Sequence, residues 1–183
     1  MDKYDKWVKA AVDKLNEDSC RGALKPQNES DVKCHLYCAL LQTRATIKGL
    51  RPNRIVVSEF QFSGFQERFD LVIAKKKRDD FQEQLIVKEK ETRRIVEVKE
   101  TSQEYPTVSA VRERIKDDVD KLRRCRNTLK EKQSEALKYS KKPHVFFFFR
   151  GAGRNGISAK TEREIKTIEK ELDDIILDWG PSC

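Results

Sequence analysis

The chain has 183 residues, of which 37% are hydrophobic and 38% charged, and its formal net charge at pH 7 is +8. This length suits one ordinary domain, expected over residues 1–183, and apolar runs recur between the charges, which excludes a disordered chain. A basic chain favours partners of negative charge, of which nucleic acid is the commonest. The first residues are charged, and the longest apolar run, Val145 to Phe149, has only a strand's length. We therefore expect no membrane span and an intracellular protein.

The cysteines indicate the redox state. There are five, an odd number without regular spacing, which is more typical of reduced thiols than of a disulfide framework. Cys34 and Cys38 are four residues apart with His35 between them, but a zinc site needs two further ligands and no second paired motif is present. We expect the cysteines to be small buried side chains.

The first predicted element is a helix over Lys3 to Leu15. Its apolar residues recur at helical spacing and are Tyr4, Trp7, Val8, Ala11 and Leu15. Residues 16–27, which include Gly22 and Pro26, are expected to form a loop. Residues 1–27 are thus an N-terminal helical extension, and residues 28–179 are the expected core.

A second helix is predicted over Asn28 to Lys48. Asn28 is a suitable N-cap, and Asp31 follows three residues later in an arrangement like a capping box. One face of this helix carries Glu29, Val32, Leu36 and Leu40. Gly49 and Pro52 end it.

Three strands are predicted next, over Arg54 to Phe62, Arg68 to Ala74 and Arg93 to Glu100. Their centres are apolar at consecutive positions, which is typical of strands covered on both faces. The stretch between the second and third strands is highly charged, although Leu85-Ile86-Val87 is suited to an extra strand.

The last part of the chain predicts a helix over Val108 to Tyr139, a strand over His144 to Arg150, a loop over Gly151 to Ser158 and a helix over Ala159 to Trp179. Sequential strands form an antiparallel meander, and a crossover helix lets the fourth strand lie parallel to the third. The expected fold is a three-layer α/β/α sandwich with a small mixed sheet, an αβββαβ core, and an additional helix at each end.

Charged residues interrupt two of the predicted strands. Glu97 and Lys99 are two residues apart, so their side chains leave the same face near the end of the third strand. Asp70 lies near the start of the second strand, which antiparallel pairing brings beside that end. A buried ion pair of Lys99 with one carboxylate would leave the other without a partner. A hard divalent cation would satisfy both carboxylates.

These residues resemble the PD-(D/E)XK nuclease superfamily. The matching segments are Arg68-Phe69-Asp70-Leu71-Val72-Ile73 and Ile95-Val96-Glu97-Val98-Lys99. The order of elements from Asn28 to Trp179 is also similar to that family, whose fold is of the restriction-endonuclease-like type. Glu-x-Lys alone is a weak motif, and its weight comes from the apolar strand around it, the Asp one hairpin earlier and the helix that follows.

The resemblance implies roles for individual residues. Asp70 and Glu97 would hold Mg²⁺ or Mn²⁺ with help from the backbone carbonyl of Val98, and the metal would lower the pKa of a water. Lys99 would position or deprotonate that water and offset charge on the phosphate, and a base role would require a lowered lysine pKa.

Further acidic residues are candidates for the same site. The family often adds an acid from the first core helix, for which Glu29 is the best match. Asp31 is the alternative, although an acid at a helix start also has a purely structural role. Glu59, near the end of the first strand, is a candidate for a further metal ligand.

The segment Gly151-Ala152-Gly153-Arg154-Asn155-Gly156 matches the G-x-G-x-x-G pattern of dinucleotide sites. We reject that interpretation because no strand is expected after the next helix and because that helix begins several residues beyond Gly156. The glycine-rich segment is equally typical of an ordinary turn and of a loop that holds nucleic-acid phosphates. Five residues near the expected site are candidates for binding phosphates or other parts of the substrate. They are Arg150, Arg154, Thr101, Ser102 and Gln103.

The expected function is that of a Mg²⁺- or Mn²⁺-dependent deoxyribonuclease that hydrolyses phosphodiester bonds. The alternatives are a catalytically inactive nucleic-acid-binding module of nuclease fold and a basic structural or adaptor protein with ion-paired strands. DNA is the expected nucleic acid, but RNA, duplex, single-strand, flap and junction substrates stay open, and a homodimer is compatible with cleavage of both strands.

Overall fold

A computed structural model describes residues 1–62, 66–75, 77–78, 85–86, 92–103, 107–132 and 142–181, with the backbone alone at 77–78, 85–86, 129–132 and 153–155. Its helices are α1 (Lys3–Cys20), α2 (Glu29–Thr43), α3 (Val108–Lys132) and α4 (Ala159–Glu171), with short 3-10 turns η1 (Arg44–Thr46) and η3 (Arg150–Asn155). Its strands are β1 (Arg54–Phe60), β2 (Phe69–Lys75), β3 (Lys77–Arg78), β4 (Leu85–Ile86), β5 (Thr92–Thr101), β6 (His144–Phe149) and β7 (Ile176–Gly180). No helix in this part of the chain has the length and apolar character needed to cross a membrane.

The main sheet has five strands in the order β1-β2-β5-β6-β7. β1, β2 and β5 pair antiparallel, whereas β6 pairs parallel with β5 and β7 pairs parallel with β6. The predicted meander and the predicted crossover through α3 are therefore confirmed. β3 and β4 form a separate two-stranded sheet, so the extra strand expected at Leu85-Ile86 is present, while Val87 lies outside the described residues.

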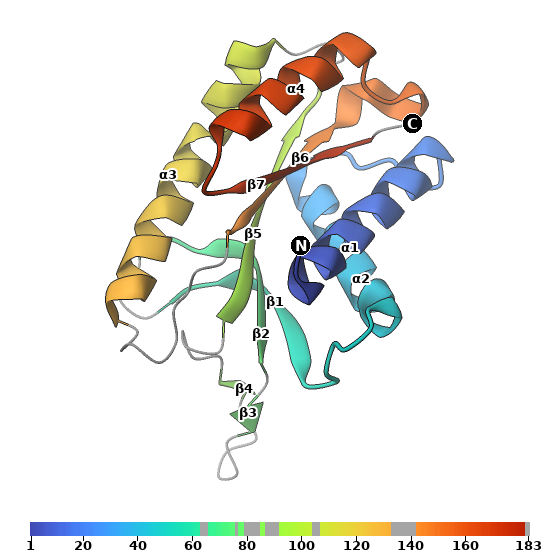
Figure 1. The fold of residues 1–183 in the computed structure, drawn as a ribbon. Helices are drawn as coiled ribbons and strands as arrows, with labels where there is room; N and C mark the ends of the chain where they lie inside the picture. Colours follow the sequence, from blue (N-terminus) through green and yellow to red (C-terminus); the bar gives the residue numbers. More distant parts are fainter. Residues whose placement is uncertain are drawn as a thin grey trace.

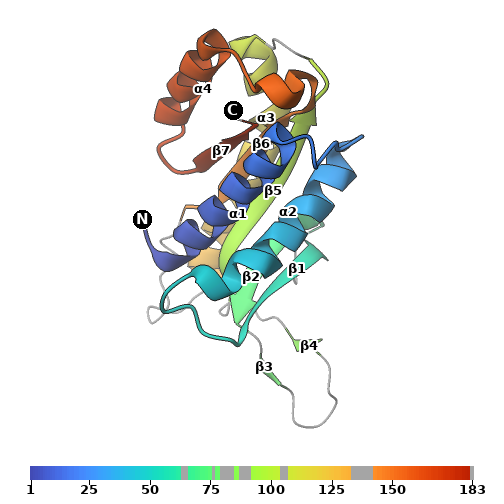
Figure 2. The same ribbon diagram turned by 90° about the vertical axis from the view of Figure 1, so that its right-hand side faces the viewer.

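Helices cover both faces of the sheet, with α1 and α2 on one side and α3 and α4 on the other (Figures 1 and 2). Each face has its own hydrophobic core. In β2 the alternation is visible in consecutive residues: Leu71 and Ile73 pack toward α1 and α2, whereas Val72 and Ala74 pack toward α3 and α4. All four are fully buried, which confirms the expectation from consecutive apolar residues and the three-layer arrangement.

Helix α1 is longer than predicted and belongs to one layer of the fold. Asp2 caps it by accepting the N–H groups of Tyr4 and Asp5, and Asp5 bonds back to the N–H of Asp2. Trp7 is fully buried, and its indole Nε1–H donates to the carbonyl oxygen of Leu40 at 2.7 Å. The loop expected from residue 16 is wrong over residues 16–20, because the buried face of the helix continues through Asn16 and Ser19.

Helix α2 begins where it was predicted and ends earlier. Asn28 caps it by accepting the N–H of Asp31, and Asp31 accepts the N–H of Gln27. The helix ends at Thr43, and the chain continues as η1 before Gly49, whose φ is +78°. The expectation of helix up to Lys48 is thus wrong for its last residues.

The C-terminal segment departs most from the prediction. α4 ends at Glu171, and β7 occupies residues 176–180 instead of more helix. Ile168, Ile175 and Leu177 all pack into the same core. The apolar residues of this segment therefore recur at helical spacing, although the chain turns between the end of α4 and the start of β7. Asp174 stabilises this turn by accepting Arg123 Nε–H at 3.0 Å.

The glycine-rich segment forms η3 over Arg150–Asn155, where a loop was expected. α4 begins at Ala159 with Ser158 as its own N-cap, three residues beyond Gly156, as expected. The other ground for rejecting a dinucleotide site was wrong, because β7 does follow the helix and carries Asp178. That carboxylate is bonded to the buried His144 at 2.6 Å, where it is unavailable to a ribose.

The cysteines differ from expectation. Cys20 is disulfide-bonded, so the expectation of reduced thiols is wrong there. Cys34 and Cys38 are free and exposed on α2, so they are not the small buried side chains we expected. Cys125 alone fits that expectation, because it is free and fully buried on α3.

Candidate active site

The register of three strands brings three acidic residues into one row. Ser58 pairs with Leu71 and Phe60 with Phe69, so Glu59 of β1 lies opposite Asp70 of β2. Leu71 pairs with Val96, which places Asp70 beside Glu97 of β5. The meander therefore gathers carboxylates that are far apart in sequence at one end of the sheet, where β1 ends and β2 begins.

Asp70 is held by both its carboxylate oxygens. Oδ2 accepts the backbone N–H of Val98 at 2.8 Å, and Oδ1 lies 3.4 Å from Nζ of Lys33 on α2. The bond to Val98 fixes Asp70 against the Glu97-Val98-Lys99 segment. Val98, whose backbone carbonyl was predicted to help hold the metal, contacts Asp70 through its N–H group.

Glu97 is the most buried charged group of this region, with 1% of its surface exposed. Its Oε2 accepts a hydrogen bond from Nζ of Lys121 at 2.7 Å, but its Oε1 is buried without a hydrogen-bond partner in the described structure. Burial, reinforced by the negative charge of Asp70, raises the pKa of Glu97 to about 8. An unpartnered buried carboxylate oxygen is costly, so this position favours a cation.

Lys99 reaches two other carboxylates. Its Nζ lies 3.3 Å from Oδ2 of Asp118 on α3 and 3.6 Å from Oε1 of Glu29 on α2. Burial lowers the pKa of Lys99, but the neighbouring charges of Asp118 and Glu29 outweigh burial and raise the pKa above its ordinary value. The lowered pKa that a base role requires is therefore absent from this arrangement.

Two of the predicted accessory acids lie at the site and one does not contribute to it. Glu29, in the first turn of α2, faces Lys99, and its pKa is raised by burial and by the charges of Asp70 and Asp118. Glu59 pairs with Lys33 and is the one described non-glycine residue with a positive φ, +51°, a conformation often found at functional sites. Asp31 has the structural role at the helix start.

Sequence reasoning missed two residues of α3, Asp118 and Lys121. Asp118 is 7% exposed and contacts Lys99, whereas Lys121 bonds to Glu97 and lies 3.9 Å from Asp118. One signal was available, because Asp118 occupies a position in the buried stripe between Ile115 and Leu122. A charge in such a stripe indicates a buried partner. The contact of Lys33 with Asp70 and Glu59 had no comparable signal.

Negative charge exceeds positive charge in this cluster. We call these residues the carboxylate–lysine cluster: Glu29, Glu59, Asp70, Glu97, Asp118, Lys33, Lys99 and Lys121. Five carboxylates therefore face three ammonium groups, which leaves an excess of two negative charges when all are ionised. Among the described residues no group of three or more His, Cys, Asp and Glu side chains is arranged to hold a metal ion. The unpartnered Oε1 of Glu97 and the charge excess are nevertheless what a divalent cation at Asp70 and Glu97 would satisfy.

The residues expected to contact nucleic acid differ in burial and in their hydrogen-bond partners. Thr101 is 1% exposed, and its hydroxyl accepts the N–H of Gln103. Ser102 and Gln103 are exposed. Arg150 donates through Nε to Glu100 Oε2 at 3.2 Å, beside the end of β5. The side chain of Arg154 lies outside the described residues.

Comparisons of the chain with protein-family models, with curated proteins and with solved structures found no match. The carboxylate–lysine cluster therefore stands on its own geometry.

Proposed function

We propose that this chain is a metal-dependent nuclease of the PD-(D/E)XK type with a restriction-endonuclease-like fold, and that DNA is its substrate. The single observation that carries the proposal is Glu97. This carboxylate lies in the sheet core beside Asp70 and its pKa is raised to about 8. Lys121 satisfies one of its oxygens and leaves the other unpartnered. Strongly perturbed groups of this kind cluster at functional sites.

Asp70 and Glu97, with the carbonyl oxygen of Val98, would hold Mg²⁺ or Mn²⁺. When bound, the ion would supply Lewis-acid polarisation of a phosphate oxygen and would favour ionisation of water near pH 7. A cation at this position would also favour the charged form of Glu97, because opposite charge opposes the effect of burial on its pKa.

The lysines contribute positive charge in this proposal. Because its pKa is raised, Lys99 is protonated at neutral pH and donates hydrogen bonds from Nζ. Its neighbours Asp118 and Glu29 hold the ammonium group at the end of β5, where it would offset the charge that develops on the pentacovalent phosphate. Lys99 thus acts as a positioned cation and water-orienting group, not as the base.

The net charge of +8 supports a polyanionic substrate. Arg150 directly follows β6, the strand that pairs with β5, and its partner Glu100 is the residue after Lys99. A phosphate of the substrate would compete with Glu100 for the guanidinium group.

The proposal is tested by cleavage of a substrate panel in Mn²⁺ and in EDTA. The panel contains supercoiled plasmid, single-stranded oligonucleotide, flap and junction DNA, and duplex RNA. We expect the wild type to cleave at least one DNA substrate in Mn²⁺, and Lys99→Ala to lower the rate by about 100-fold or more. Glu162→Gln, which removes an exposed pair with Lys166 on α4, is the matched control and should leave the rate unchanged. Equal activity of wild type and Lys99→Ala on every substrate would contradict the proposal.

One observation favours the second candidate, a nucleic-acid-binding or adaptor protein without turnover. The carboxylates already have ammonium partners: Lys33 for Asp70, Lys121 for Glu97, and Lys99 for Asp118. Titration with Mg²⁺ or Mn²⁺ separates the two candidates. A nuclease centre predicts a rise in the melting temperature of the wild type that is lost in Asp70→Ala, whereas no rise in either protein favours the second candidate.

A further inference from the structure

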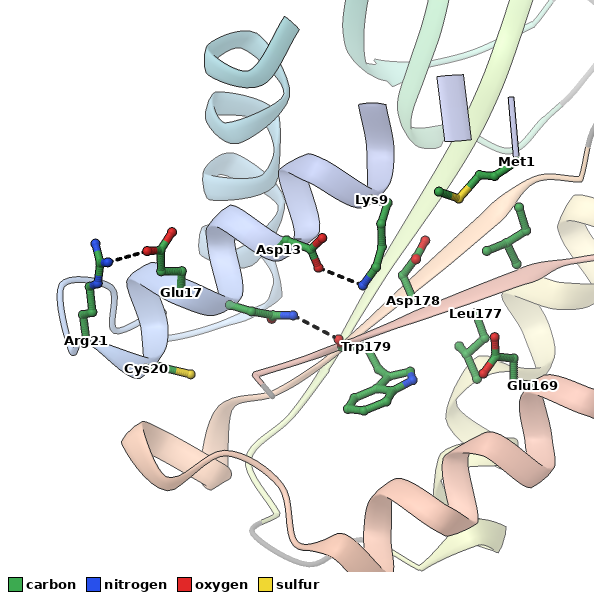
Figure 3. A pocket seen from close by; sticks show the side chains of 12 residues that line it. Met1, Lys9, Asp13, Glu17, Cys20, Arg21, Glu169, Leu177, Asp178 and Trp179 are labelled. Atoms are coloured by element: carbon green, nitrogen blue, oxygen red, sulfur yellow. Dashed lines mark hydrogen bonds and ion pairs between the residues drawn. The ribbon is translucent and has the colours of Figure 1, made fainter. Parts of the chain in front are cut away.

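β7 forms one edge of the five-stranded sheet, and a cleft of about 760 Å³ lies along it. Five of the residues that line the cleft come from α1, and Arg21, the C-cap of that helix, is a sixth. The five are Lys9, Asp13, Asn16, Glu17 and Cys20. β7 forms its floor, and Glu169 of α4 lies on the opposite wall (Figure 3). The cleft shares no residue with the carboxylate–lysine cluster.

The backbone of β7 has hydrogen-bonding groups directed into this cleft. The N–H of Ile176 donates to the carbonyl oxygen of Pro143, on the β6 side. Because the groups of successive residues alternate in direction along a strand, those of Leu177 and Trp179 point away from β6. The carbonyl oxygen of Trp179 accepts a bond from Asn16 Nδ2 at 3.3 Å, which agrees with this direction. No hydrogen bond joins the N–H groups of Leu177 and Trp179 to other described residues.

An edge strand with free N–H groups is a template for another strand. The lining part of α1 runs from Lys9 to Cys20, twelve residues, which is a helix length of about 16 Å. An added strand of about five residues has the same length. The cleft therefore has the dimensions of a short extended peptide lying between α1 and α4.

The charged side chains of the cleft indicate the chemical class of its partner. The side chains that line it carry four carboxylates, of Asp13, Glu17, Asp178 and Glu169, and two cations, of Lys9 and Arg21. Lys9 and Asp13 form one i,i+4 ion pair and Arg21 and Glu17 form another, so the acidic excess comes from Asp178 and Glu169. Glu169 has no ion pair within the described residues. On a chain of net charge +8 such a surface does not favour nucleic acid. A second copy of β7 would bring no cation, because its sequence is Ile-Leu-Asp-Trp-Gly.

We propose that this cleft binds an extended, lysine- or arginine-bearing peptide segment of a partner protein, which adds as a strand to the edge of β7. Backbone bonds to Leu177 and Trp179 would hold the segment. Its basic side chains would meet Asp13 and Glu17 on one wall and Glu169 on the other. Trp179, which is partly exposed at the floor, would contact it directly.

The test uses the full chain and two capped peptides, TKVKVKT and TEVEVET. Trp7 is fully buried, so a change in tryptophan fluorescence on titration reports Trp179. We expect saturable binding of the basic peptide alone, with new protection of the Leu177 and Trp179 amides in NMR hydrogen exchange. Binding without that protection, or equal binding of both peptides, would overturn the proposal.

Two neighbouring substitutions on α1 give a matched comparison. Glu17 lines the cleft and Asp18 does not, yet each forms an i,i+4 pair with a basic residue of the same helix. Glu17→Lys should weaken binding of the basic peptide about fivefold, the effect of one partly exposed charge contact. Asp18→Lys should change it less than twofold. Equal effects would overturn the proposal, as would a sedimentation result in which the wild type is a dimer that Glu17→Lys dissociates.

Discussion

Glu97 connects the stability of the fold with the proposed chemistry at the scale of one residue. Its carboxylate is buried, has a single hydrogen-bonded lysine, and lies beside a second acid. Such a group destabilises the protein in the absence of a cation and becomes useful when one binds. Lys121 reduces the penalty but leaves Oε1 without a partner.

In the metal-free protein, the free energy of unfolding should therefore fall less with rising pH in Glu97→Gln than in the wild type. The pKa of Glu97 is about 8 in the folded protein against 4.5 for the unperturbed group, so the folded state holds a proton that the unfolded state has lost between those values. Stability then falls as pH rises through this window. Each pKa unit corresponds to about 1.4 kcal/mol, so the wild type should lose about 3 kcal/mol between pH 6 and pH 9 relative to Glu97→Gln.

Urea denaturation in EDTA at several pH values measures this difference. The control is Glu162→Gln, a partly exposed residue away from the cluster, and its stability curve should run parallel to that of the wild type. Parallel curves for Glu97→Gln and the wild type would show that the buried carboxylate carries no such penalty.

The same residues show what sequence predicts at this scale. Alternation along a strand placed Glu97 and Lys99 on one face, and pairing of sequential strands brought Asp70 beside them. The identity of their lysine and aspartate partners was not predictable, because the sequence of a helix does not say which of its residues lies over which strand position. Asp118 was detectable as a charge in an apolar stripe, but its contact with Lys99 was not.

At the scale of elements, α3 completes the cluster by adding side chains to a site that the strands begin. Asp118 and Lys121 are three residues apart and so lie on one helix face, which packs over β5. The crossover helix thus has two roles: it returns the chain for a parallel β6, and it holds Lys99.

Asp118→Asn should reduce cleavage through its effect on the position of Lys99. We expect a rate lower by about 10-fold to 100-fold, because a misplaced catalytic group loses its alignment. Asp117 is the neighbouring residue and is exposed, so Asp117→Asn is the matched control and should retain the wild-type rate. Comparable losses in both variants, or a melting temperature that falls only in Asp118→Asn, would instead point to a general effect on α3.

A second buried network joins α1, β5, β6 and β7 away from the cluster. His144 lies between Asp178, at 2.6 Å from Nδ1, and Asp5, at 3.3 Å from Nε2. Arg94, which is also buried, bonds to Asp5 and Asp2. Burial lowers the pKa of His144, but hydrogen bonds to Asp178 and Asp5 outweigh burial and raise it above 6.5.

Asp178→Asn should destabilise the protein most in mildly acidic solution. The stabilisation from a raised histidine pKa is complete below the unfolded value near 6.5 and is lost as pH rises through the folded pKa. We expect a loss of about 2 kcal/mol at pH 5.5 that becomes smaller above neutrality. Denaturation of Asp178→Asn and of the exposed control Asp173→Asn at pH 5.5 and pH 8.5 measures it, and a loss that grows with pH would contradict this assignment.

The whole molecule is a five-stranded mixed sheet between two helical layers, and most of that followed from sequence. Consecutive apolar residues such as Leu71 to Ala74 predicted strands covered on both sides, and two covered faces require two helical layers. β7 was missed because Ile168, Leu172, Ile175 and Ile176 satisfy the period of a helix even though a turn lies among them. Periodicity alone does not locate such a break.

At this scale the two proposed surfaces are separate. The carboxylate–lysine cluster lies where β1 ends and β2 begins, whereas the cleft follows the opposite edge strand, β7. A peptide partner and a nucleic acid would therefore bind without competing, and the failure of either proposal would leave the other standing.

The most direct test of the central proposal is the single-turnover rate of Mn²⁺-dependent cleavage, measured on the best DNA substrate for wild type, Glu97→Gln and Glu162→Gln. The account predicts that the wild type and Glu162→Gln cleave at equal rates in Mn²⁺ and that neither cleaves in EDTA. Glu97→Gln should cleave at least about 100-fold more slowly than the wild type, although it is the more stable protein above pH 7. Cleavage by Glu97→Gln at the wild-type rate would contradict it.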